Sequence, residues 1–184
     1  GIVISGATVN DFSGNAVSSY DINNDGYDDI IIGEDQADPI LRNSDVKTYV
    51  IYGSNSPVSI DLLSLTASQG MVISGAVAGD TSGNAVSSGD INNDGYDDII
   101  IGAINADPNS RTSDGKTYII YGSSSPVNID LLSLMVSQGV AISGAIATDF
   151  SGYAVSNGDI NGDGFDDVII GAANADPSSR IDAG

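Results

Sequence analysis

The sequence predicts an all-β protein assembled from repeated four-stranded units. The chain repeats itself with a period of about 69 residues. Within each period, short runs of β-branched and apolar residues are separated by clusters of Gly, Asn, Asp and Ser, which is typical of strands and turns rather than helices. Four short strands per unit is the content of one β-propeller blade. We therefore expect blades of four antiparallel strands.

The three copies are unequal in length. Roughly 51 of the first 69 positions are identical in the second copy, whereas the third copy stops about two thirds of the way through a unit. A closed propeller needs at least four blades. This chain has material for two, with an extra strand at the N-terminus and two at the C-terminus, so we expect an incomplete ring or a fragment of a longer array. The repeats are assigned to residues 1–69, 70–138 and 139–184.

The second unit shows the expected strands most plainly. Each is a short, mainly apolar or β-branched run bounded by turn-forming residues. The tyrosines of the fourth run, Tyr118 and Tyr121, and their counterparts Tyr49 and Tyr52, are interpreted as packing residues rather than as a sugar-binding surface. The expected strands are 71–74, 85–88, 98–101 and 117–121.

Two connections complete the unit. Residues 107–115 form a polar stretch with Pro and Gly, which predicts a loop that joins strands at the rim. In the stretch 125–134, Asp130 can cap one helical turn while Leu131, Leu132 and Leu134 pack inward, so we expect a short helical or irregular connection. The alternative for these leucines is an apolar patch that binds a partner.

An acidic string precedes one strand in every repeat, at 21–29, 90–98 and 159–167. Oxygen-bearing side chains at alternate positions, with Gly at the sixth, are what a hard divalent cation needs from a short turn. In the first copy, Asp21, Asn23 and Asp25 offer side-chain oxygens, Tyr27 offers its carbonyl, and Asp29 returns from the next strand. The glycine permits the left-handed backbone that gathers these oxygens.

Calcium suits such mixed oxygen ligation better than magnesium, which demands tight octahedral geometry. An EF-hand is rejected, because isoleucine stands at the twelfth position where that motif has a bidentate glutamate. The plain alternative is that the string is only a turn. We expect three Ca²⁺, one per repeat. The expected ligands are Asp21, Asn23, Asp25, Tyr27 and Asp29; Asp90, Asn92, Asp94, Tyr96 and Asp98; and Asp159, Asn161, Asp163, Phe165 and Asp167.

Other recurring aspartates are given different roles. Those at the eighth position of the string point away from a ligand at the ninth if the strand alternates, so they are interpreted as supporting or surface carboxylates. Those that precede the Ser-Gly segments are explained by turn formation. The first set is Asp28, Asp97 and Asp166, and the second is Asp11, Asp80 and Asp149.

Composition narrows the possible partners. The chain has 25 acidic and 5 basic residues and a formal charge of −20. This excess argues against nucleic acid and anionic membranes, which are bound by clustered Lys and Arg. The chain has no Cys and no His, which excludes disulfides, thiolate metal sites and His-based acid–base chemistry. No apolar run approaches a membrane span, so we expect no membrane insertion.

The unit resembles a known repeat. Residues 150–156 (Phe-Ser-Gly-Tyr-Ala-Val-Ser), the acidic string and residues 168–172 (Val-Ile-Ile-Gly-Ala) are similar to the FG-GAP repeat of integrin α-subunit propellers and many bacterial surface proteins. The Ala-Asp-Pro and Asp-Leu-Leu-Ser-Leu connectors favour the bacterial extracellular type. The resemblance implies a propeller whose inner strand leads through the calcium loop into the second strand. Thr81 departs from the family, because it replaces a Phe.

These observations support three functional hypotheses. The first is a non-enzymatic, calcium-binding module outside the cell or on its surface that serves adhesion or protein–protein interaction, with structural calcium. The second is a repetitive subunit of an extracellular fibre, sheath or surface layer. The third, part of a metal-dependent hydrolase, is disfavoured because breaks in the repeat such as Glu34 for Ala103 are isolated. Exposed strand edges predict a homo-oligomer or filament, with other chains or further repeats as partners.

Overall fold

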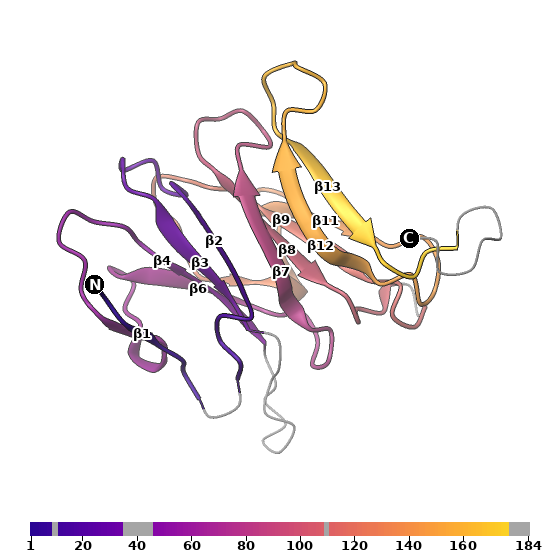
Figure 1. The fold of residues 1–184 in the computed structure, drawn as a ribbon, viewed down its shortest axis with the longest axis horizontal. Helices are drawn as coiled ribbons and strands as arrows, with labels where there is room; N and C mark the ends of the chain where they lie inside the picture. Colours follow the sequence, from indigo (N-terminus) through magenta and orange to yellow (C-terminus); the bar gives the residue numbers. More distant parts are fainter. Residues whose placement is uncertain (9–10, 35–45, 109–110, 177–184) are drawn as a thin grey trace.

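The computed structural model describes residues 1–8, 11–34, 46–108 and 111–176. Over these residues the chain is all-β, and its only regular helices are short 3₁₀ turns. Two four-stranded antiparallel blades and part of a third stand side by side in chain order, without a closed ring (Figure 1). The expected fold class is confirmed. None of the described helical segments is long and apolar enough to cross a membrane.

The first blade contains three strands of its own repeat and one of the next. The fourth strand pairs antiparallel with the third although it lies at the start of the second repeat. The blade boundaries are therefore shifted by one strand relative to the sequence repeats, because the outer strand of a blade comes from the next repeat. The strands of this blade, from inner to outer, are β2 (Ala16–Tyr20), β3 (Asp29–Gly33), β4 (Lys47–Ile51) and β6 (Gly70–Ser74).

The second blade has the same construction and borrows its outer strand from the third repeat. Within the part of the chain that the structure describes, the inner hairpin of a third blade follows. The arrangement therefore matches the expected two blades and two C-terminal strands. The second blade consists of β7 (Ser82–Gly89), β8 (Asp98–Ala103), β9 (Lys116–Ile120) and β11 (Gly139–Ser143), and the third of β12 (Ser151–Gly158) and β13 (Asp167–Ala172).

Short parallel pairings join each connection to the preceding outer strand. Strand β10 (Ile129–Asp130) of the second blade pairs with β6 of the first. In the same way β5 (Ile60–Asp61) pairs with the N-terminal strand β1 (Ile4–Ser5). The sequence suggested no strand at either connection. The pairing of β10 with β6 binds the two complete blades together at their outer edges.

The leucine-rich connection is partly as expected. Asp130 caps the 3₁₀ turn η3 (Leu131–Ser133) and accepts a hydrogen bond from the Leu132 amide at 2.9 Å. Leu131 is buried and Leu134 packs against the core, but Leu132 is 70 % exposed, so its predicted inward packing is wrong. A single tight turn of three residues directs successive side chains to different sides, so it cannot bury adjacent leucines together.

The core lies between the blades. Alternate residues of a strand face opposite sides of its sheet, so Ile31 and Ile73 pack towards Ile99 and Ile101 of the second blade. Both faces of β8 are covered and all its residues are buried, whereas β13 at the end is only partly covered. The buried Tyr49 and Tyr118 are core residues, as expected. The opposite face of the first blade holds a smaller cluster of Ile32, Tyr49, Ile51, Ile60 and Leu62.

Candidate metal sites in the acidic loops

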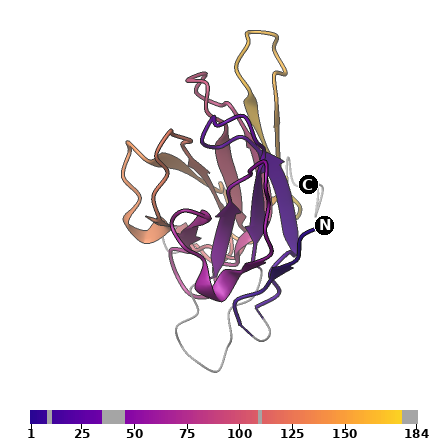
Figure 2. The same cartoon turned by 90° about the vertical axis from the view of Figure 1, so that its left-hand side faces the viewer.

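The three acidic loops occupy equivalent places. Each connects the inner two strands of a blade: β2 to β3, β7 to β8 and β12 to β13. All three lie at the same end of the sheets, at the top of Figures 1 and 2. The sequence prediction that the string forms the inner hairpin loop is confirmed by the pairing of these strands.

The loop backbone is left-handed at two positions. The expected one is the glycine at the sixth position, where Gly26 has φ +89°. The other is the fourth position, where Asn24 and Asn93 both have φ 56° and Gly162 has φ 77°. Asn is among the few non-glycine residues that adopt this conformation readily. The Asn or Gly at the fourth position was the signal that sequence reasoning overlooked.

The first aspartate of each loop organises the turn. Asp21 accepts hydrogen bonds from the Asp25 amide at 3.0 Å and from the Gly26 amide at 2.8 Å. Asp90 accepts from the corresponding amides, both at 3.0 Å. Asp159 does the same at 3.1 and 3.0 Å. Because all three loops share this pattern, one conformation is built into the sequence of the string.

The ninth residue anchors the loop to the blade. One carboxylate oxygen of Asp29 accepts from the Gly53 amide at 2.8 Å and the other from the Ile22 amide at 3.2 Å. Burial raises the pKa of Asp29 to about 6, and repulsion from the Asp25 and Asp21 carboxylates adds to this rise while the Gly53 hydrogen bond opposes it.

The second loop has the same anchor. Asp98 accepts from the Gly122 amide at 2.9 Å and from the Ile91 amide at 3.2 Å. Burial raises its pKa to about 6, with a further contribution from the Asp94 carboxylate. In the third loop Asp167 accepts from the Ile160 amide at 3.0 Å. A nearby positive charge stabilises the ionised form of buried carboxylates that have other carboxylates as neighbours.

The loops offer the types of oxygen that calcium binds in proteins, and one of these oxygens has no hydrogen-bond partner. Asn23 Oδ1 is buried and has no hydrogen bond, whereas Asn92 and Asn161 at the same position each accept an amide at 2.9 Å. An unpaired buried oxygen is costly unless something binds it. However, nowhere among the described residues do three acidic side chains converge closely enough to hold a metal ion. The predicted set also includes an asparagine and a backbone carbonyl in each loop, so the predicted ligands stay a prediction.

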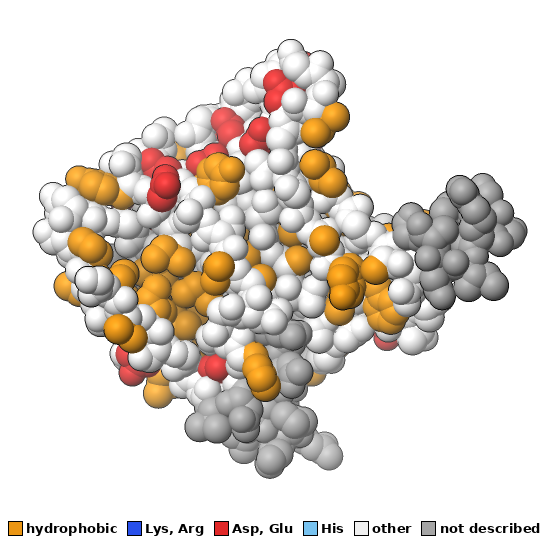
Figure 3. Space-filling model, viewed as in Figure 1, with side chains coloured by type: hydrophobic (Ala, Val, Ile, Leu, Met, Phe, Trp, Pro, Cys, Tyr) orange, Lys and Arg blue, Asp and Glu red, His pale blue; other side chains and the backbone are white. Residues whose placement is uncertain are grey.

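No basic side chain neutralises these loops within the described ranges. The one ion pair found there joins Arg111 to Asp114 at 2.6 Å, outside the acidic strings. The face drawn in Figure 3 has acidic side chains along its upper edge, and no Lys or Arg beside them. The loops thus concentrate negative charge without a protein counter-charge.

The eighth position links each loop to the blade before it. The Asp97 amide donates to the Asp21 carbonyl at 3.4 Å, and the Asp166 amide donates to the Asp90 carbonyl at 3.2 Å. Burial raises the pKa of Asp97, and the nearby Asp90 carboxylate adds to the rise. Asp28, in the first blade, is exposed. The inter-blade role of this backbone was not foreseen from the sequence.

The second position of the loop has a role that sequence reasoning missed. Ile22 is 1 % exposed and belongs to the core cluster between the blades. Its carbonyl accepts a hydrogen bond from the Ser123 amide of the second blade at 3.2 Å. The available signal was an isoleucine recurring inside an otherwise polar loop, as Ile91 and Ile160.

The aspartates before the Ser-Gly segments form turns. Asp11 accepts from the Thr8 amide at 2.6 Å and from the Ser13 amide at 3.3 Å. The Asp80 amide donates to the Val77 carbonyl at 3.2 Å and the Asp149 amide donates to the Ile146 carbonyl at 3.4 Å, and each of these bonds closes a turn. These contacts agree with the interpretation of the set as turn residues.

Comparison with known proteins identifies the repeat. FG-GAP repeats match residues 13–52, 82–120 and 151–184, which together make up more than half of the chain. This chain belongs to the FG-GAP repeat family. Each match begins near an inner strand and lies within one of the sequence units 1–69, 70–138 and 139–184.

Curated relatives share these FG-GAP repeats. The chain is 31 % identical over 166 residues to integrin alpha pat-2 of Caenorhabditis elegans, covering 88 % of this chain and 13 % of the relative. It is 29 % identical over 157 residues to phosphatidylinositol-glycan-specific phospholipase D of Bos taurus (85 % and 18 %). It is 27 % identical over 173 residues to human integrin alpha-8 (89 % and 15 %). The chain spans less than a fifth of the length of these relatives.

Proposed function

We propose that this chain is a calcium-stabilised FG-GAP module that serves adhesion or protein–protein interaction outside the cell or on its surface. The observation that carries the proposal is the unpaired, buried Asn23 Oδ1 in a loop of carboxylates that has no basic neighbour in the described structure. The likeness to integrin alpha subunits supports the interaction role. The ions act as structural elements.

Each loop would hold one Ca²⁺ through oxygens of the first, third, fifth and ninth residues and the carbonyl of the seventh. Calcium accepts six to eight oxygens and admits water into its shell. The carboxylates of the first and ninth residues accept hydrogen bonds from backbone amides. A carboxylate has about four lone pairs, so each keeps others free to bind an ion. Burial, with added repulsion from neighbouring carboxylates, raises the pKa of Asp29 and Asp98, and a bound cation would offset both effects. Because the unfolded chain lacks the assembled loop, bound calcium stabilises the fold.

A non-enzymatic role follows from the uniformity of the repeats. An active site in a repeat array is expected to differ from its repeat equivalents, whereas the first aspartate makes the same hydrogen bonds in all three loops. The relatives named as phospholipase D align with this chain over 18 or 19 % of their own length. Their enzymatic name therefore carries little weight for these repeats.

The proposal is tested by calcium titration of the whole chain. We expect calorimetry to show about three bound ions and the melting temperature to rise with calcium and fall again on adding EDTA. Replacement of the unpaired amide, Asn23→Ala, should remove or weaken one site. Asp107→Asn, a carboxylate outside the loops that accepts the Ser113 amide at 2.6 Å, is the matched control and should leave the stoichiometry unchanged. Unchanged melting in calcium and EDTA would refute calcium stabilisation.

A second candidate function is a building block of an extracellular fibre or sheath. It is favoured by the near identity of the first two repeats and by the incomplete covering of the last strands. Electron microscopy of the purified chain separates the two. A building block forms regular assemblies unaided, whereas an adhesion module needs its ligand.

A further inference from the structure

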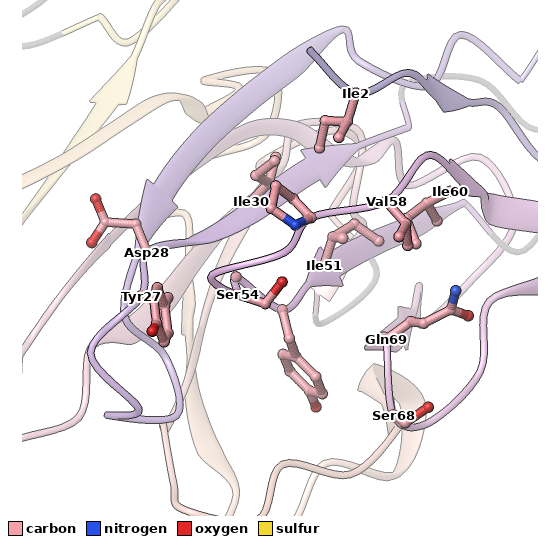
Figure 4. A pocket seen from close by; sticks show the side chains of 13 residues that line it. Ile2, Tyr27, Asp28, Ile30, Ile51, Ser54, Val58, Ile60, Ser68 and Gln69 are labelled. Carbon is pink, nitrogen blue, oxygen red and sulfur yellow. The ribbon is translucent and has the colours of Figure 1, made fainter.

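The outward face of the first blade carries an apolar hollow of about 400 Å³ (Figure 4). It is lined by Ile30, Ile51 and Ile60 of the blade and by Ile2 and Val58 beside them. Hydrophobic side chains also gather over this blade on the left of Figure 3. The hollow opens next to the first acidic loop, whose Tyr27 forms part of its wall.

The same place on the second blade shows what such a hollow accepts. Its lining residues are the repeat equivalents of those above, and Ile22 of the first blade's loop lies among them. Ile22 is 1 % exposed there, and the remaining space is only about 100 Å³. The equivalents are Met71 for Ile2, Ile99 for Ile30, Ile120 for Ile51, Val127 for Val58 and Ile129 for Ile60.

Two backbone hydrogen bonds hold this isoleucine in place. The Ser123 amide donates to the Ile22 carbonyl at 3.2 Å, and the Asp97 amide donates to the Asp21 carbonyl at 3.4 Å. The equivalent donors of the first blade are the amides of Ser54 and Asp28, which border the open hollow. The first blade therefore presents the receiving half of a junction that the second blade has completed.

The loop of the third blade presents the inserting half. In the third loop Ile160 is 71 % exposed, and it follows the Asp159 carbonyl as Ile22 follows that of Asp21. The Asp159 carboxylate accepts from the Asp163 and Gly164 amides as Asp21 does from Asp25 and Gly26, and the Ile160 amide donates to Asp167 as Ile22 does to Asp29. These shared hydrogen bonds hold the loop backbone around the inserting isoleucine, which lowers the ordering cost of binding.

The inner strands beside this junction are also compatible. Between the first two blades Ser18 Oγ lies 3.3 Å from Ser88 Oγ, and between the next two Ser87 Oγ donates to Asn157 at 2.8 Å. In a junction between two copies, the corresponding pair is Ser156 of one copy and Ser19 of the other. Both are hydroxyls, as in the first pair. Gly158, like Gly89, has no side chain to obstruct the approach.

We propose that Ile160 of one copy of this chain inserts into the hollow on the first blade of a second copy. The contact repeats the internal junction between the first and second blades, with the Asp159 and Ile160 carbonyls accepting from the Asp28 and Ser54 amides of the second copy. Because different surfaces meet, the contact is heterologous and leads to a ring if it closes and to a filament if it does not. It does not depend on the proposed calcium sites.

Association of the purified chain tests the proposal. We expect the mass measured by light scattering to rise with protein concentration, and Ile160→Asp to weaken association at least tenfold. The matched control is Leu132→Asp, because Leu132 is equally exposed, at 70 %, but lies on the η3 turn. A wild-type chain that stays monomeric, or equal association of the wild type and Ile160→Asp, would overturn the proposal.

Cross-linking locates the contact independently, and the absence of cysteine in the chain makes it specific. Chains carrying Ile160→Cys are mixed with chains carrying Val58→Cys and treated with a short bifunctional maleimide. We expect a mixed dimer, whereas Ile146→Cys, which is also exposed, should give none with Val58→Cys. Ile22→Cys with Val127→Cys in one chain is the positive control. Mixed dimers in equal amount from Ile146→Cys would show collision rather than docking and refute the assigned contact.

Discussion

At the scale of single residues, Glu34 is the clearest departure from the repeat. It stands where the second repeat has Ala103, and it is buried. Its carboxylate accepts from the Ser13 hydroxyl at 3.2 Å and from the Lys47 amide at 3.1 Å, and it bonds to the Tyr49 hydroxyl. The equivalent hydroxyl of Tyr118 has no partner. Glu34 thus gives the buried Tyr49 hydroxyl a hydrogen-bond acceptor. However, its own negative charge is not balanced by a basic group among these contacts.

This environment predicts a pH-dependent stability. Burial raises the pKa of Glu34, and the Asp11 carboxylate adds to the rise. Since the ionised form is the disfavoured one in the fold, Glu34 lowers stability above its raised pKa, and this penalty disappears as the pH falls towards the ordinary carboxyl pKa. Glu34→Gln keeps hydrogen-bonding atoms without charge. It should therefore raise the free energy of unfolding at pH 7, with a gain that shrinks towards pH 4.

Urea unfolding of both proteins across this pH range measures the difference. Because the acidic loops are the same in both chains, their titration cancels in the comparison. A gain that is independent of pH would show that loss of the charge is not its cause.

At the scale of elements, close approach of neighbouring sheets explains the glycines at the ends of the second strands. A Cβ on Gly102 of β8 would lie 2.1 Å from the Gly152 carbonyl oxygen of β12. A Cβ on Gly33 of β3 would lie 2.1 Å from the Gly83 carbonyl oxygen. The equivalent Gly171 of β13 has only ordinary contacts, at 3.5 Å or more. The glycine is needed where another blade follows.

This difference predicts unequal costs for one substitution. Gly102→Ala should destabilise the protein by about 1–3 kcal/mol, because the backbone of β12 cannot yield without shifting the sheet. Gly171→Ala places the same methyl group at the repeat-equivalent site and should cost less than about 1 kcal/mol. Chemical unfolding of the two variants measures both values. Equal costs would contradict the interpretation that blade packing excludes the methyl group.

At the scale of the whole molecule, each blade depends on its neighbours for burial. Strand β8 is buried along its length because a blade covers each face, whereas β13 has a blade on one side only. The outer strands taken from the next repeat and the parallel pairing of β10 with β6 then join successive blades. Stability in such an array comes from nearest-neighbour contacts as much as from single repeats.

Hydrogen exchange should follow this gradient. We expect the amides of β8 to exchange slowest and those of β13 much faster, because local opening needs less free energy where fewer apolar contacts must separate. Mass spectrometry of peptic peptides covering 98–103 and 167–172 measures the two rates in one sample. Equal protection of the two peptides in a dilute chain would contradict the dependence on neighbouring blades.

The sequence by itself determined the strands of the blades and the acidic loops. These follow from local patterns: apolar runs between turn residues, and the Gly at position 26. The capping of η3 by Asp130 was also local and was confirmed. The metal ligands remain a prediction. In the described structure the first carboxylate of each loop accepts hydrogen bonds from loop amides, and no three acidic side chains converge on one point.

Only the tertiary structure decided which repeats of the chain contact one another. The borrowed outer strand β6, the parallel pairing of β10 with β6, the exposure of Leu132 and the insertion of Ile22 into the next blade all depend on contacts between repeats. Nearly identical copies have the same local pattern, so the sequence cannot show whether a strand or an isoleucine binds its own repeat or the next. Burial of apolar surface between adjacent sheets makes that choice.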